Sequence, residues 1–121
     1  MSTDLRALLQ SALLPAMRAG DKDTVAVVRS ALAAIANAEA VPVPSITPVG
    51  DGPVAGAVTG VGSTEVPRRE LTPDEVREVV EHERQERVQA AEESEAGGLG
   101  EYAARLRTQA AALAFLLERT A

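Results

Sequence analysis

The stretch AMRAGDKDTVAVVRSALAAIANAE, residues 16–39, has the pattern of two helices joined by a short charged corner. Gly20 can end one helix in a left-handed conformation, and Asp21 can cap the start of the next. After the corner, apolar residues recur at steps of three and four, which places them on one helix face. This row contains Val25, Val28, Leu32 and Ile35, and Glu39 continues it. The stretch therefore predicts a helical hairpin.

The residues before the corner predict the first arm of that hairpin, with Thr3 or Asp4 as its N-cap. Its apolar face contains Leu5, Leu8, Leu9, Ala12, Leu13, Ala16 and Met17. Pro15 lies inside this arm, lacks a backbone N–H and crowds the preceding turn. We therefore expect a kink or a break near residues 11–14.

The stretch LTPDEVREVV, residues 71–80, carries a complete signal for the start of a third helix. Thr72 is a suitable N-cap, Pro73 fits the first helical position, and Glu75 can complete a capping box. We expect this helix to turn five residues inward, namely Val76, Val79, Val80, Val88 and Ala91. The glycine-rich run EAGGLGE, residues 95–101, then breaks it.

A fourth helix follows, with apolar residues at heptad-like spacing. We expect its buried face to contain Leu99, Tyr102, Leu106, Ala110, Leu113 and Leu117, widened near its end by Phe115 and Leu116. Four amphipathic helices predict an all-α fold, a four-helix bundle-like domain over residues 1–121.

Residues 41–69 interrupt this pattern between the second and third helices. They contain five prolines and five glycines and almost no charge before Arg68. This composition excludes a helix and leaves two alternatives, a flexible loop or a short β-hairpin.

The composition limits the functions that the chain can have. The 121 residues carry a net charge of −6 and contain one Phe, one Tyr, no Trp and no Cys. The core must therefore consist of Leu, Val and Ala, and thiol chemistry is excluded. There is no apolar run that could span a bilayer and no signal-peptide pattern, so we expect a cytoplasmic protein without membrane contact. Because the chain repels polyanions overall, nucleic-acid binding would need a local basic stripe.

The sequence offers no catalytic, cofactor-binding or metal-binding residues. His82 is the sole histidine, and without a second histidine one turn away it indicates a solvated charged face. GDGPVA, residues 50–55, fits a permissive dinucleotide-binding pattern, but no helix follows to hold a pyrophosphate. The serines have no general-base partner. We therefore expect no cofactor and no catalytic activity.

Seven basic residues remain as candidates for contacts. Arg29 lies beside the apolar row of the second helix, where it either pairs with a glutamate near His82 or lays its stem over the core as a surface arginine. The other six lie outside the acidic third helix and form a candidate face for RNA or a protein partner. They are Arg6, Arg18, Lys22, Arg105, Arg107 and Arg119.

Residues 5–40 and 70–118 together resemble the YqeY-like family, small bacterial proteins related to the tail of the tRNA-dependent amidotransferase B subunit. The features that carry the resemblance are Ala16-Met17, the corner Asp21-Lys22-Asp23, Arg29 ahead of Leu32, the alanine-rich run to Asn37 and Glu39, Leu71-Thr72 with Asp74-Glu75, Arg87, and a closing apolar helix up to Leu117. The resemblance extends to the N-terminal helical domain of that family only.

The family label, a carbon–nitrogen ligase with glutamine as amide donor, implies a link to tRNA-dependent amidotransferases. Since no amidase nucleophile is present, the resemblance implies a non-catalytic accessory or interaction module whose partner is tRNA or an amidotransferase-related protein. The alternative is a helical protein–protein interaction scaffold that binds another protein or itself and has no tRNA role.

Overall fold

The computed structural model describes residues 4–40 and 69–120. These residues form four helices, α1 (Leu5–Ala19), α2 (Lys22–Glu39), α4 (Pro73–Ala96) and α5 (Gly100–Arg119), and no strand. The predicted all-α, bundle-like fold is confirmed. The described helices include none that is both long and apolar enough to cross a bilayer. The alternatives predicted for residues 41–69 fall on residues that, except for Arg69, lie outside the described ones.

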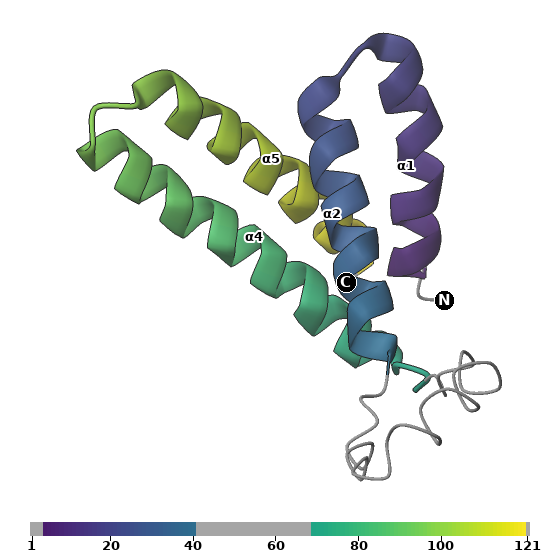
Figure 1. Cartoon of the computed structure of the whole chain (residues 1–121). Helices are drawn as coiled ribbons and strands as arrows, with labels where there is room; N and C mark the ends of the chain where they lie inside the picture. The colour runs from purple at the N-terminus through teal and green to yellow at the C-terminus, as the bar shows by residue number, and fades with distance from the viewer. Residues whose placement is uncertain (1–3, 41–68, 121) are drawn as a thin grey trace, which may run out of the picture.

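The four helices are arranged as two antiparallel hairpins, α1–α2 and α4–α5 (Figure 1). α2 packs against both α4 and α5, whereas α1 packs mainly against α2. The α4–α5 hairpin extends past the region where it meets α2, and its tip at Gly97 and Gly98 stands away from the other hairpin. The molecule is therefore a wedge that is packed at one end and open at the other.

The helix boundaries follow the signals in the sequence. Gly20 has a φ of 72° and ends α1, and the Asp21 carboxylate accepts a 3.1 Å hydrogen bond from the Thr24 N–H at the start of α2. At α4, the Thr72 hydroxyl accepts from the Glu75 N–H at 3.1 Å, while the Glu75 carboxylate accepts from the Thr72 N–H at 2.9 Å. This is the predicted capping box, and it satisfies donors that a helix start otherwise leaves unpaired.

Of the kink or break expected near residues 11–14, the break is absent, because α1 is continuous from Leu5 to Ala19. Pro15 is exposed, so the carbonyl of Ser11 that lacks its usual partner faces solvent rather than the core. At this position proline removes one hydrogen bond and leaves the helix intact.

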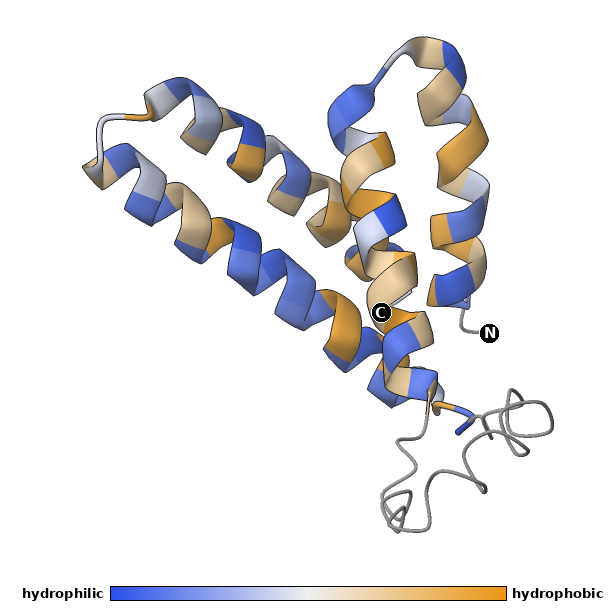
Figure 2. Ribbon diagram, in the orientation of Figure 1, coloured by the Kyte–Doolittle hydropathy of each residue, from blue (hydrophilic) through white to orange (hydrophobic). Residues whose placement is uncertain are grey.

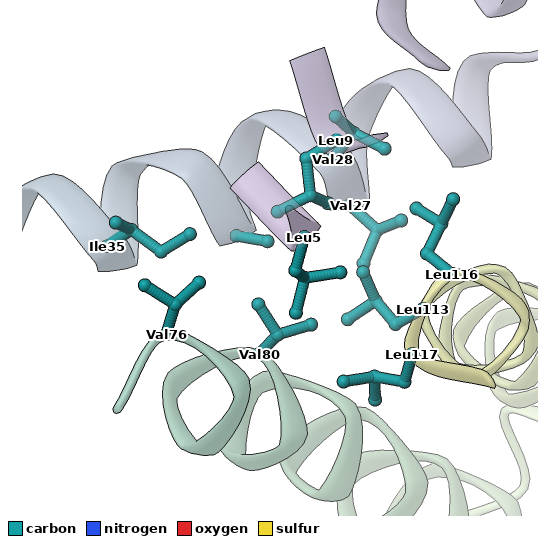
Figure 3. Packing of buried hydrophobic residues seen from close by; sticks show 11 residues of the cluster. Leu5, Leu9, Val27, Val28, Ile35, Val76, Val80, Leu113, Leu116 and Leu117 are labelled. Carbon is teal, nitrogen blue, oxygen red and sulfur yellow. The ribbon is translucent and has the colours of Figure 1, made fainter. Parts of the chain in front are cut away.

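The main core lies where the two hairpins meet (Figure 3). Its largest fully buried side chains are Leu9, Val27, Val28, Ile35, Val80 and Leu113. A second, smaller cluster of Ala91, Ala103 and Leu106 joins α4 to α5 nearer the tip. Because alanines line this cluster, the two helices can approach closely there. Figure 2 shows the corresponding pattern, with hydrophobic residues toward the interior and a mostly hydrophilic α4.

Several predicted faces need correction. In α2, Val27 and Ala31 are fully buried, whereas Val25 and Leu32 are only partly so, because α2 contacts helices on two sides rather than one. In α5, Leu106, Ala110, Leu113, Leu116 and Leu117 are buried as expected.

The predicted burial of Leu99, Tyr102 and Phe115 is wrong, since these side chains are 58%, 53% and 60% exposed. Leu99 is the N-cap of α5 and lies outside the helix. Tyr102 lies in the first turn of α5, near the tip of the hairpin that extends beyond α2. Phe115 follows the buried Leu113 by two residues, which places it on the opposite side of the helix.

Candidate functional site

A ring of polar side chains connects three helices at the junction of the two hairpins. Asp23 on α2 accepts a 3.1 Å hydrogen bond from Gln109 on α5, and the Gln109 carbonyl accepts one of 3.2 Å from Arg87 on α4. Arg87 pairs with Glu83 at 3.0 Å, and Glu83 accepts a 2.8 Å hydrogen bond from Ser30, back on α2. The bonds run from Asp23 to Ser30, and α2 itself closes the ring because it carries both residues, so the ring aligns α2 with the α4–α5 hairpin.

The side chains of this ring are partly buried. The Arg87 and Glu83 side chains are only 18% and 12% exposed, and no buried side-chain polar atom in the described part of the chain lacks a partner. A partly buried charge pair that is also hydrogen-bonded favours one alignment of the helices. The contacts of these side chains are with one another, which is the pattern of a structural network.

Arg29 does not take part in the ring. Its guanidinium is exposed and lies 4.0 Å from the Met17 sulfur, and within the described ranges no carboxylate is within ion-pair distance of it. The predicted ion pair between Arg29 and a glutamate near His82 is therefore absent, and the neighbouring Ser30 reaches Glu83 instead.

The structure does not gather the six predicted basic residues on one face. Arg6 pairs with Glu39 at 2.5 Å near the packed end of the wedge, and Arg107 pairs with Glu95 at 2.5 Å within the α4–α5 hairpin. Arg105 reaches across to Asp23 on α2 at 3.3 Å. Three of the six cations are thus balanced by a carboxylate, which lowers their attraction for phosphate.

The remaining three basic residues lie at opposite ends of the molecule. Arg18 and Lys22 are exposed at the α1–α2 corner and form no ion pair within residues 4–40 and 69–120. Arg119 lies at the end of α5, and its guanidinium carbon is 5.8 Å from the centre of the Phe115 ring. Among these six residues, only Arg18 and Lys22 lie in the same corner and form no ion pair with a described carboxylate, and Asp21 and Asp23 lie in that corner with them.

The surface of α4 bears an open hollow of about 660 Å³, lined by Asp74, Arg77, Glu78, Glu81, His82 and Gln85. Hydrogen bonds from Arg84 lower the pKa of Glu81, which stays ionised near neutral pH and is unsuited to act as a general acid. His82 is exposed and lies 3.1 Å from Glu86. In the described part of the chain, no group of three His, Cys, Asp or Glu side chains could hold a metal ion. The hollow is a solvated charged face.

A different hollow, of about 480 Å³, lies at the tip of the α4–α5 hairpin. It is lined by residues 98–102 and Arg105, which places the exposed Leu99 and Tyr102 beside one acidic and one basic side chain. Tyr102 and Leu99 can contact an apolar side chain of a partner, and Glu101 and Arg105 can contact the polar groups around that side chain. This is the described surface best suited to a partner.

The sequence patterns misplaced the aromatic residues for an identifiable reason. Tyr102 fits the periodic spacing of the buried residues of α5. It is exposed because α2 does not extend far enough to cover it. Phe115 departs from the heptad-like row, and that departure was a signal of exposure. The polar ring has one weak signal in the sequence. Glu83 and Arg87 are four residues apart on a charged helix, a spacing that allows an ion pair.

No protein-family model, no curated protein and no solved structure matches the chain.

Proposed function

We propose that the chain is a non-catalytic accessory module of the YqeY-like family, acting in the cytoplasm by binding a protein partner linked to tRNA-dependent amidotransferases. The observation that supports the binding role is the position of its aromatic side chains. The protein has two aromatic residues, Tyr102 and Phe115, and both are more than half exposed. Its core is built without either of them.

The physical argument starts from what a small core needs. Burying an aromatic side chain removes about 150–250 Å² from water, more than a Leu or Val contributes. A domain of this size that leaves both aromatic groups outside gives up that contribution. Tyr and Arg are enriched among the residues that dominate binding energy at protein interfaces. Tyr102 beside Arg105, at the tip of the α4–α5 hairpin, provides both residue types in one hollow.

The experiment is a titration of the labelled chain with the purified tRNA-dependent amidotransferase of the organism that encodes it, followed by fluorescence anisotropy. We expect saturable binding that Tyr102→Ala weakens by about tenfold or more, the effect of losing an interface anchor. Leu14→Ala is the matched control, because Leu14 is 52% exposed on α1, away from the tip. Absence of binding, or equal losses in the two variants, would refute the proposal.

The second candidate partner is tRNA, and the specific observation in its favour is the exposed Arg18 and Lys22 at the α1–α2 corner, which form no ion pair within the described residues. Binding of bulk tRNA that weakens with salt and is lost in an Arg18→Glu, Lys22→Glu double variant would support it. Arg107→Glu is the control, because Arg107 is already balanced by Glu95. No binding at the lowest salt concentration would exclude this partner.

A further inference from the structure

Met17 presents its sulfur at the surface, near the end of α1. The periodicity of the first helix predicts a place on its apolar face, but the side chain is 48% exposed, whereas the neighbouring Ala16 is buried. Leu14, three residues earlier on the same side of the helix, is also exposed. A peroxide in solution can therefore reach the sulfur, and a polar group formed there stays outside the core.

A cation from the other arm of the hairpin lies against this sulfur. The Nη2 of Arg29 on α2 is 4.0 Å from the Sδ of Met17 and donates a weak hydrogen bond to it, since a thioether is a poor acceptor. Within the described ranges Arg29 forms no ion pair. The guanidinium therefore lies beside a group that uses little of its capacity to donate.

The two carboxylates of the α1–α2 corner are bound elsewhere. Asp21 accepts hydrogen bonds from the N–H and the hydroxyl of Thr24, at 3.1 and 2.7 Å, and Asp23 is bound by two side chains of α5. Neither carboxylate is paired with Arg29, so a stronger acceptor formed on the Met17 sulfur would not compete with them for its donors.

We infer that Met17 is a site of oxidation to methionine sulfoxide and that Arg29 binds the new oxygen. In the reaction with hydrogen peroxide, the O–O bond breaks and one oxygen forms a bond to the sulfur. The sulfur is oxidised by two electrons, and the second oxygen takes the proton of the first and leaves as water. The sulfoxide oxygen is polar, and Nη2 lies close enough to donate a charge-assisted hydrogen bond to it.

The consequence is a redox-dependent connection between α1 and α2. Oxidation of a buried methionine disrupts the packing around it, because the sulfoxide is polar. Met17 is at the surface, so its oxidation introduces no such disruption and adds a bond across the hairpin. The inference goes beyond the proposed function and needs no partner, since it concerns the α1–α2 hairpin alone.

Treatment of the full chain with hydrogen peroxide, followed by peptide mapping by mass spectrometry, tests the site. We expect one added oxygen at Met17. A Met17 that stays unmodified at peroxide concentrations that oxidise free methionine overturns the inference. Met17→Leu is the control for oxidation elsewhere in the chain, and any shift in its urea midpoint on treatment is subtracted.

Urea denaturation of treated and untreated protein tests the role of Arg29. We expect the shift of the midpoint on oxidation to be more positive in the wild type than in Arg29→Ala, by about 0.5 M. Arg18→Ala is the matched control, because Arg18 is an exposed arginine adjacent to Met17 in the sequence, and it should respond as the wild type does. Equal shifts in the wild type and Arg29→Ala overturn the inference, as does an equal loss in Arg18→Ala. The amidotransferase titration tests the proposed function separately.

Discussion

Gln109 on α5 donates a 3.1 Å hydrogen bond to Asp23 on α2, which joins the two helical hairpins through side chains rather than through backbone. Arg105 reaches the same Asp23 oxygen at 3.3 Å from one turn earlier. The carboxylate of Asp23 thus holds the start of α2 against α5. The ring continues through Arg87 and Glu83 to Ser30, two turns further along α2.

The ring predicts that Arg87→Ala destabilises the fold. The substitution leaves the carboxylate of Glu83, 12% exposed, without its cation and removes a donor to Gln109. We expect the free energy of unfolding, measured by urea denaturation, to fall by about 1–3 kcal/mol. The matched control is Arg84→Ala, one turn earlier on α4 in a more exposed pair with Glu81, which should cost under about 1 kcal/mol. Equal losses in the two variants would contradict a structural role for the ring.

The opposite orientations of Leu113 and Phe115 on α5 give a second prediction. Leu113→Ala removes a fully buried side chain from the main core and should lower the free energy of unfolding by about 2–5 kcal/mol. Phe115→Ala removes a larger but exposed side chain and should change it by no more than about 0.5 kcal/mol. Thermal unfolding followed by circular dichroism, at concentrations where the chain is monomeric, distinguishes them. A larger loss for Phe115→Ala would show that this side chain is part of the core.

The turn between α4 and α5 allows a test with two glycines. Gly98 has a φ of 85°, which a residue with a Cβ adopts only with strain, although nothing lies within 4 Å of an added methyl group. Gly98→Ala should therefore destabilise the protein by about 1–2 kcal/mol. At Gly100, the first residue of α5, φ is not positive and the space is also open, so Gly100→Ala should be neutral or stabilising by up to about 1 kcal/mol. Chemical denaturation of both variants measures the two changes in the free energy of unfolding.

The capping box of α4 predicts how stability depends on pH. The backbone N–H of Thr72, and then Arg69, lower the pKa of Glu75 below its ordinary value of 4.5. A lowered pKa in the folded protein stabilises it at pH values above 4.5, and this contribution is lost as the pH falls through the folded-state value. The wild-type protein should therefore lose stability on acidification below about pH 4.5.

Glu75→Gln separates titration from capping, because glutamine can still accept the Thr72 N–H but carries no charge. Its stability should fall less than that of the wild type between about pH 5 and pH 3, as followed by denaturation at each pH. A variant with an unchanged acid dependence would show that Glu75 contributes nothing to it.

Much of this architecture was predictable from local sequence signals. Gly20 with Asp21, and Thr72 with Glu75, determine helix ends through contacts within a few residues, and the helix ends predicted from them are confirmed. The buried row from Leu106 to Leu117 follows from periodicity alone. Such features depend on near neighbours, which a sequence displays directly.

The features that the sequence did not predict depend on the relative lengths and positions of the helices. Tyr102 has the periodicity of a buried residue, and it is exposed because the α4–α5 hairpin extends past α2. Ser30 rather than Arg29 reaches Glu83, because Ser30 is the partly buried residue of the two and Arg29 is exposed. Lengths and crossing angles of helices are properties of the whole assembly, so spacing within one helix does not reveal them.

Binding of a protein partner at Tyr102 can be followed through the tyrosine itself. Because the chain contains a single tyrosine, labelling with 3-fluorotyrosine gives one ¹⁹F resonance that reports on the hairpin tip alone. We predict that this resonance shifts or broadens saturably as unlabelled tRNA-dependent amidotransferase is added. A resonance that stays unchanged to the highest amidotransferase concentration would contradict binding at Tyr102.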